Sequence, residues 1–501
     1  MPGFKSIVSA SALVALCAGS APSPAKADPA LKWTDCHKGL KCANLTVPLN
    51  WETETEKNIT LGIGMLPAAD KAKRIGYLFT NPGGPGGSAI EDLVGKIEIW
   101  KASKLHEYFD LVAPDPRGTT YSTPVSCDPA VWNVRVPQIP RTKDEFNEMA
   151  KAYLERGRSC AEKSGDLLNH VDTVSAVRDL EHVRRALGDE PMNFIGFSYG
   201  SQLGAQYAEY FPHNIRALAL DGILDHSEPD NDFWLQESNG YEVTVNQFFA
   251  WCKQNSTCAL HKEADLPAKF DAFIDRANDS PVPAPGCDDP NFGAYPCYNN
   301  VTGYELLKSM QGVISFPYPD TPQLPGWAGL SSMLEQAMSG NASLFAQPKF
   351  DKPTRGEFAY AAIFCQDWNR AHSTALEYMI KRTVAEVQSP HTRGQGEMWY
   401  LQAMCMHWPA PVNNPPHSYA RAFADRKMKT PILMTNAIYD PETPIQWAWT
   451  VLQQMGEDNT ALVMRNGSGH TSYYHPGATR NIIEDYLINL KVPVSGTIVQ
   501  D

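Results

Sequence analysis

The sequence predicts an α/β fold in which a mostly parallel sheet is covered by helices on both faces. Short apolar runs alternate with amphipathic segments over residues 28–225, and the alternation returns over residues 430–501. The intervening residues 226–429 lack it and carry prolines, aromatic clusters and six of the ten cysteines beyond residue 27. We therefore expect the two outer stretches to form the core and the middle one to form a large, mainly helical cap inserted above it.

Each predicted element follows from a local pattern. The predicted strands are short apolar runs, at residues 59–65, 75–80, 108–113, 192–195, 217–220, 431–436 and 461–464. Residues 173–187 predict an amphipathic helix because apolar side chains recur at the helical period, and Gly188 predicts its end. Residues 201–211 and 482–490 predict two further helices.

The pentapeptide GFSYG at residues 196–200 lies between a predicted strand and a predicted helix. A serine between two glycines at such a junction matches the nucleophile elbow of the α/β-hydrolase fold. Glycine is needed on both sides because a Cβ would collide with the neighbouring strand and helix. This placement predicts Ser198 as a nucleophile, against the alternative of a merely structural serine.

The other residues that a serine hydrolase needs occur in the expected order along the chain. A glycine-rich loop, NPGGPGG at residues 81–87, precedes Ser198, whereas Asp440 and His470 follow late apolar strands. The order oxyanion loop, Ser, Asp, His is that of α/β-hydrolases. His470 would take the proton of Ser198, and Asp440 would orient the imidazole. Glu442 is the alternative acid; Asp440 is preferred because Glu442 lies between two prolines.

Backbone N–H groups must meet the oxyanion that develops during attack. One is predicted to come from Tyr199, directly after the nucleophile, and the other from the glycine loop. Pro85 has no N–H, so Gly84 is the predicted second donor, with Gly83 next. A phosphate-binding loop is the alternative, but no Lys-Ser/Thr follows the glycines.

The N-terminus predicts export. Lys5, an apolar stretch at residues 7–19 and the small residues of Ala25-Lys26-Ala27 match a signal peptide over residues 1–27, so that the mature chain begins at Asp28. No later run is long enough for a membrane span. The net charge of −13 gives nucleic-acid binding no support. We expect a secreted protein with neither nucleic-acid nor membrane partners.

Cysteines and sequons fit the same compartment. An even number of cysteines beyond the signal peptide predicts disulfides, and sequential pairing is the simplest connectivity: Cys36–Cys42, Cys127–Cys160, Cys252–Cys258, Cys287–Cys297 and Cys365–Cys405. A metal site is the competing interpretation, but no C-x-x-C or H-x-x-x-H motif exists. Predicted glycosylation sites are Asn44, Asn58, Asn255, Asn278, Asn300, Asn341 and Asn466.

Several motifs together resemble secreted tripeptidyl-aminopeptidase-like α/β-hydrolases, whose relatives include prolyl aminopeptidases. They are NPGGPGGS, GFSYGS, DPRG at 115–118, ALDGILD at 219–225, DPETP at 440–444 and GSGH at 467–470. The resemblance covers most of the mature chain, with residues 430–501 as the TAP-like C-terminal part of the core. Pro82 stands where relatives often have histidine, as in the tripeptidyl branch, and the departure from the family pattern is Thr119-Thr120-Tyr121-Ser122 after the DPRG loop.

This resemblance implies a serine exopeptidase that releases short peptides or single residues from free N-termini and needs no cofactor. Such an enzyme needs an anion to meet the substrate ammonium, and Asp367 and Glu237 are the candidates, each against the alternative of a structural carboxylate. An esterase or lactonase acting on a small-molecule ester is the alternative function, because acyl-enzyme chemistry serves esters and amides alike. A catalytically inactive binding protein is a third possibility, which the complete triad disfavours.

Overall fold

The computed structural model describes residues 31–53, 57–289, 292–293, 296–321, 324–368 and 374–500. The predicted signal peptide lies outside them. Within these residues, a ten-stranded sheet has the strand order β1-β2-β3-β5-β4-β6-β7-β12-β13-β14. From β5 to β14 all neighbours are parallel, whereas β1, β2 and β3 form an antiparallel edge that joins β5. This is the predicted α/β-hydrolase fold.

The strands of this sheet are β1 (Thr34–Asp35), β2 (Lys41–Pro48), β3 (Asn58–Leu66), β4 (Gly76–Asn81), β5 (Phe109–Pro114), β6 (Met192–Phe197), β7 (Ile215–Asp221), β12 (Ile432–Tyr439), β13 (Thr460–Ser468) and β14 (Thr497–Val499). Seven of these strands (β3 to β7, β12 and β13) match the predicted apolar runs to within a few residues, whereas β1, β2 and β14 were not predicted.

Helices cover both faces of the sheet, which is why its central strands are apolar on both sides. One face carries α1 (Ala89–Gly95), α2 (Ile97–Ala102), α3 (Lys104–Tyr108) and α17 (Ala478–Asn489); the other carries α6 (Thr173–Ala186), α7 (Tyr199–Tyr210) and α16 (Ile445–Met455). Along β6, Ile195 packs with the first group and Phe194 with the second, because successive side chains of a strand point to opposite faces.

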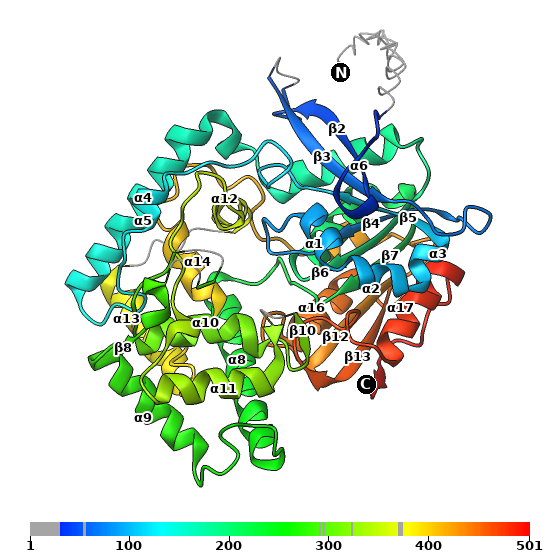
Figure 1. Ribbon diagram of the computed structural model, residues 1–501. Helices are drawn as coiled ribbons and strands as arrows, with labels where there is room; N and C mark the ends of the chain where they lie inside the picture. The colour runs from blue at the N-terminus through cyan, green and yellow to red at the C-terminus, as the bar shows by residue number, and fades with distance from the viewer. Residues whose placement is uncertain are drawn as a thin grey trace, which may run out of the picture.

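The cap is mainly helical, as expected, and lies beside the sheet (Figure 1). Its helices are α8 (Asp230–Gln254), α9 (Leu266–Asp279), α10 (Gly303–Ile314), α11 (Gly326–Met338), α12 (Gly356–Asp367), α13 (Ala375–Gln388), α14 (Glu397–Cys405) and α15 (Ala420–Phe423). Two short ribbons accompany them: β8 (Val282–Pro283) with β9 (Asn300–Val301), and β10 (Pro319–Thr321) with β11 (Leu324–Pro325).

A segment from before residue 225 joins the cap. Helices α4 (Pro129–Trp132) and α5 (Lys143–Ser164) lie on the cap side in Figure 1, and α5 packs against α13 and α14. The sequence assigned these residues to the N-terminal part of the core. The limits 226 and 429 remain a prediction, to which the structure adds that the cap is assembled from two separate stretches of chain.

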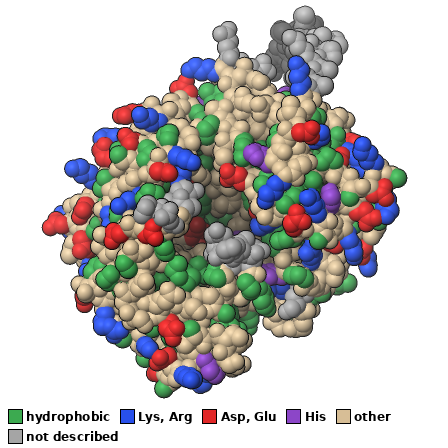
Figure 2. All heavy atoms as spheres, in the orientation of Figure 1, with side chains coloured by type: hydrophobic (Ala, Val, Ile, Leu, Met, Phe, Trp, Pro, Cys, Tyr) green, Lys and Arg blue, Asp and Glu red, His purple; other side chains and the backbone are tan. Residues whose placement is uncertain are grey.

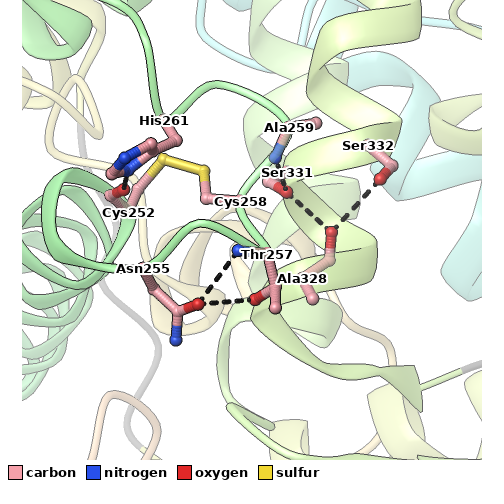
Figure 3. The surroundings of a disulfide bond; sticks show 9 residues. All are labelled: Cys252, Asn255, Thr257, Cys258, Ala259, His261, Ala328, Ser331 and Ser332. Atoms are coloured by element: carbon pink, nitrogen blue, oxygen red, sulfur yellow. Dashed lines mark hydrogen bonds between the residues drawn. A yellow bond between two sulfur atoms is a disulfide. The ribbon is translucent and has the colours of Figure 1, made fainter.

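The cysteines form five disulfides in the same sequential pairing. Figure 3 shows Cys252–Cys258, which ties the end of α8 to the following loop, where Ala259 donates its N–H to Ser331 of α11. Beside it, Asn255 accepts hydrogen bonds from the backbone and hydroxyl of Thr257. Disulfides are typical of proteins that fold in an oxidising compartment.

The predicted sequons lie at positions of differing exposure. Asn44, Asn58, Asn341 and Asn466 are exposed, whereas Asn255, Asn278 and Asn300 are half-buried. Their glycosylation stays a prediction. None of the described helices is both long and apolar enough to cross a membrane.

Candidate active site

Ser198 lies at the turn between β6 and α7. Its φ of +57° is rare for a residue with a side chain, so the neighbouring structure must hold the turn in place. The flanking glycines explain how: a Cβ on Gly196 would stand 2.2 Å from the carbonyl oxygen of Gly200, and one on Gly200 would stand 2.6 Å from that of Asn81. The predicted elbow is therefore present, with the N–H of Ser198 donated to Asp221 O at 2.9 Å.

The glycine loop lies directly against this elbow. Gly83 has a φ of +90°, and a Cβ on it would stand 2.9 Å from Ser198 Cβ and 3.0 Å from the Tyr199 nitrogen. Its own N–H is donated to the side chain of Asn81 at 3.0 Å. Among the described residues the N–H of Gly84 has no such acceptor. The geometry thus favours Gly84 over Gly83 as the partner of the Tyr199 N–H.

His470 follows β13 and meets Asp440, which follows β12. Nδ1 of His470 lies 2.9 and 3.0 Å from the two oxygens of Asp440. Backbone N–H groups of Glu442, Thr443 and Thr471 also donate to this carboxylate at 2.9–3.1 Å. These hydrogen bonds hold the carboxylate of Asp440 in place, and Asp440 in turn orients the imidazole of His470.

The other imidazole nitrogen faces a second carboxylate. Nε2 of His470 lies 3.2 Å from Glu442, and among the described hydrogen bonds it has none with Ser198. Burial opposes the charged imidazole, but the carboxylates of Asp440 and Glu442 outweigh burial and raise the pKa of His470 to about 10. The contacts with the two acids therefore favour the protonated imidazole of His470.

Glu442 belongs to a cluster with Glu237 of α8 and Glu397 at the start of α14. Glu237 is fully buried: one oxygen accepts the Met398 N–H at 2.8 Å, and the other has no hydrogen-bond partner among the described residues. Burial and the charge of Glu397 raise its pKa well above the usual range. Burial and the charge of Glu442 raise the pKa of Glu397 to about 7. The cluster is acidic and short of positive charge.

Asp367 does not belong to this cluster; it lies against α6 and α7, where it contacts Thr173 and Gln202. Its oxygens accept hydrogen bonds from the backbone N–H of Thr173 at 2.9 Å, from Asn414 at 3.0 Å and from Gln202 at 3.3 Å. The Thr173 hydroxyl bridges it to the hydroxyl of Tyr199. These protein partners surround a fully buried carboxylate, which supports the helix of the nucleophile rather than facing a substrate.

Asp221 is a positioning residue that the sequence analysis did not single out. It is fully buried at the end of β7 and accepts the N–H groups of Ser472 and Tyr473 at 2.7 and 2.8 Å, and the Thr435 hydroxyl at 2.7 Å. It therefore holds the loop that follows His470. The sequence feature that could have indicated this role is an aspartate at the end of an apolar run, within ALDGILD at 219–225.

Asp115, the first residue of the DPRG segment, has the same role on the oxyanion side. It accepts hydrogen bonds from the Ser88 hydroxyl at 2.8 Å and from the N–H groups of Ile90 and Tyr121 at 3.1 and 2.9 Å. Ser88 follows the glycine loop directly, so this buried carboxylate anchors the loop to the end of β5.

Two cavities flank the site. One of about 610 Å³ is lined by Gly84–Gly87 and by Glu397. The other, of about 520 Å³, is lined by His470, Pro82 and Phe197. Figure 2 shows a hollow near the centre of the molecule, with acidic side chains inside it. The described residues contain no group of three or more His, Cys, Asp or Glu side chains arranged to hold a metal ion.

Comparisons with known proteins agree with the fold. Residues 78–264 match the family described as alpha/beta hydrolase fold, and residues 392–498 match the family described as TAP-like protein. A tripeptidyl aminopeptidase of Streptomyces lividans is 32% identical over 469 residues, covering 88% of this chain and 81% of the relative.

Two mycobacterial proteins are also similar over most of their length. One, named serine protease Hip1, from Mycobacterium tuberculosis (strain ATCC 25618 / H37Rv), is 27% identical over 496 residues, covering 93% of this chain and 90% of the relative. Another, named carboxylesterase B, from Mycobacterium tuberculosis (strain CDC 1551 / Oshkosh), is 25% identical over 478 residues, with coverages of 91% and 87%.

Proposed function

Because the chain belongs to the tripeptidyl-aminopeptidase-like family of α/β-hydrolases and is a serine hydrolase, we propose that it is a secreted exopeptidase. It would remove short peptides or single residues from free N-termini. The relatives named as a tripeptidyl aminopeptidase and a serine protease support peptide substrates.

The cluster of Glu237, Glu397 and Glu442 supports this proposal most strongly. Among the described ion pairs none joins a lysine or arginine to these carboxylates; the cationic contact is that of Glu442 with His470. Clustered carboxylates disfavour one another's ionised forms when buried. A substrate ammonium would supply the missing positive charge, whereas an acetylated N-terminus or a chain interior would not. Of the two predicted candidates, Glu237 rather than Asp367 fits this role.

The proposed reaction uses the groups around the elbow. Ser198 Oγ attacks the scissile carbonyl carbon while Nε2 of His470 takes its proton, and Asp440 stabilises the imidazolium. The N–H groups of Gly84 and Tyr199 bind the oxyanion. The imidazolium then protonates the leaving amine, and water hydrolyses the acyl-enzyme by the same steps.

Substrate recognition would be coupled to this chemistry through Glu442. With its carboxylate on Nε2, His470 cannot act as a base towards Ser198. A substrate ammonium among the three glutamates attracts Glu442 and frees Nε2 for the hydroxyl. A free amine would therefore assist catalysis as well as binding.

Secretion is supported by the predicted signal peptide and by the five disulfides, which require an oxidising environment. Export can be tested directly by expressing the full chain and sequencing the N-terminus of the protein recovered from the medium. A mature start at Asp28 is expected, and retention of the whole chain inside the cell would contradict it.

The deciding experiment is hydrolysis by the purified mature protein, with Ser198→Ala as the control. The panel contains free-amine tripeptide, dipeptide and single-residue coumarin amides, their N-acetylated twins and short p-nitrophenyl esters. Turnover of free-amine amides that acetylation abolishes is the expected result. Equal turnover of acetylated twins would refute the exopeptidase.

An esterase is the second candidate, supported by the relative named carboxylesterase B. Its acyl-enzyme chemistry would use the same residues. Turnover of esters while every amide stays intact would establish the esterase and contradict the proposed peptidase activity.

A further inference from the structure

The cavity beside the glycine loop contains two cations that the proposed reaction does not use. Arg156 of α5 and Lys308 of α10 both line it, together with the aromatic rings of Trp132, Tyr153 and Tyr400. Neither cation forms an ion pair with a carboxylate among the described residues. Arg135 in the same cavity differs, because Glu305 neutralises it through a hydrogen bond of 2.6 Å.

Arg156 retains unused donor capacity. One terminal nitrogen donates to the carbonyl oxygens of Trp132 and Val134 at 3.2 and 2.7 Å. Its Nε is buried without a hydrogen-bond partner. The guanidinium carbon lies 5.7 and 5.0 Å from the ring centroids of Trp132 and Tyr153, so aromatic faces rather than a counter-ion compensate part of its charge.

Lys308 is in a similar position. Its Nζ lies 4.5 Å from the ring centroid of Tyr400. Burial and the neighbouring charge of Arg156 lower the pKa of Lys308 to about 8, although Glu305, Glu397 and Glu357 act in the opposite direction. Two like charges in a partly apolar cavity, neither of them ion-paired with a carboxylate, are unfavourable, and a bound anion would relieve both.

The position of the cavity tells which part of a substrate would reach it. His470 protonates the leaving group, so the leaving group lies on the His470 side, where the cavity of about 520 Å³ opens. The cavity with Arg156 and Lys308 adjoins Gly84–Gly87 and Glu397, and so lies on the acyl side. The acyl part of a peptide has no terminal carboxylate, because its last carbonyl is the one being cleaved. A carboxylate there must come from an Asp or Glu side chain.

We propose that Arg156 and Lys308 form an anion subsite that binds an acidic side chain among the residues released from the N-terminus. The inference rests on the proposed exopeptidase function and gives it a substrate class. The peptide ammonium is bound by the glutamate cluster, of which Glu397 lines this cavity, and the acidic side chain is bound by the two cations.

The test compares Glu with Gln, which have the same shape, at each position of free-amine tripeptide coumarin amides. At one position we expect Glu to exceed Gln in kcat/KM by about tenfold or more, since charge-assisted hydrogen bonds to two cations are strong. Lys308→Gln should bring this ratio close to one, and Lys308→Arg should largely retain it. Lys491→Gln, at a lysine whose side chain is 77% exposed, should leave the ratio unchanged.

Equal kcat/KM for Glu and Gln at every position would overturn the subsite while leaving the exopeptidase intact. Loss of the Glu preference in Lys308→Arg as well as in Lys308→Gln, with thermal midpoints unchanged, would equally count against it, because charge alone should suffice for most of the effect.

A binding measurement separates the subsite from the proposed function. Ser198→Ala protein is titrated calorimetrically with free tripeptides that contain Glu or Gln. Tighter binding of the Glu peptide, abolished by adding Lys308→Gln, supports the subsite even if no free-amine amide is cleaved. Equal affinities overturn it.

Discussion

At the scale of the residue, His470 is subject to two opposing demands. Asp440 must hold Nδ1 so that Nε2 is left for the nucleophile, and the contact between Nδ1 and Asp440 is present. Glu442 meanwhile occupies Nε2 and favours the protonated ring. Asp440 therefore assists catalysis, whereas Glu442 opposes it by blocking Nε2, and substitutions can distinguish these two effects.

Asp440→Asn should lower kcat by about 10⁴-fold, because an amide favours the wrong imidazole tautomer while leaving the shape of the site intact. The measurement is kcat on the preferred amide, with the thermal midpoint as a check on folding. Asp425→Asn, at an exposed aspartate, is the matched control. A loss smaller than tenfold would exclude Asp440 as the orienting acid.

Glu442→Gln should lower the pH at which kcat/KM is half-maximal by about one pH unit or more. Activity requires neutral His470, and removing one of the two carboxylates that raise its pKa makes the neutral form available at lower pH. The pH profile is measured on a p-nitrophenyl ester without an amine, so that amine recognition does not enter. An unchanged or higher midpoint would argue against the contact.

At the scale of the element, the site depends on helices that disulfides join. Cys365–Cys405 connects α12 with α14. Helix α14 begins with Glu397, and Tyr360 of α12 lines the same cavity. This disulfide therefore joins two helices that line the cavity of about 610 Å³ beside the glycine loop.

Replacing both Cys365 and Cys405 by Ser opens a loop with a sequence separation of 40. In the chain-entropy account this lowers the free energy of unfolding by about 4 kcal/mol. Urea unfolding measures the loss, and KM for free-amine peptides should rise with it. The Cys36→Ser/Cys42→Ser pair, with a separation of 6, should cost only about 2 kcal/mol and leave KM unchanged. Equal effects of the two pairs on KM would contradict the assignment.

At the scale of the whole molecule, one sheet joins two halves of the sequence. Strand β7 pairs in parallel with β12, at Ala219 with Leu433 and at Leu220 with Met434. The nucleophile and oxyanion loop precede this joint, and the acid and base follow it. The cap, inserted between them, contributes Glu237 and Glu397. Buried ionisable groups thus accumulate where core and cap meet.

These groups predict that the protein is less stable at pH 9 than at pH 6.5. Burial raises the pKa of Asp367 and Glu397 to about 7, so the stability that their protonated forms contribute is lost as the pH rises from their unfolded pKa of about 4 through 7, and the last part of this loss falls above pH 6.5. The stability that His470 contributes is fully present below its unfolded pKa of about 6.5 and is lost as the pH rises through about 10. Buried His226, with its pKa lowered to about 3, opposes folding only below about pH 6.5. Thermal midpoints at both pH values test this, and a higher midpoint at pH 9 would contradict it.

Much of the core could be predicted because its signals are local. The glycine loop and the serine elbow each occupy a few consecutive residues after a strand, so Ser198, Gly84 and Tyr199 could be predicted from local sequence. Their placement on the same edge of the sheet as His470 and Asp440 follows from the fold, because the carboxyl ends of parallel strands meet at one edge.

The cap could not be predicted to the same depth. Glu237 and Glu397 are 160 positions apart, and no local pattern indicates that α8 and α14 bring them together. Asp367 drew attention beside Cys365, but only the fold reveals that Thr173 and Asn414 occupy its oxygens. Residues 143–164, which form α5, were assigned to the core, and only the fold reveals that this helix belongs with the cap.

The division of the site across the β7–β12 joint has a consequence for biosynthesis. A chain that ends before residue 430 has the serine and the oxyanion loop but neither the acid nor the base. Hydrolytic activity therefore cannot begin before these later residues have been synthesised. The enzyme gains hydrolytic activity only when the residues from 430 onwards have been synthesised and β12 and β13 have joined the sheet.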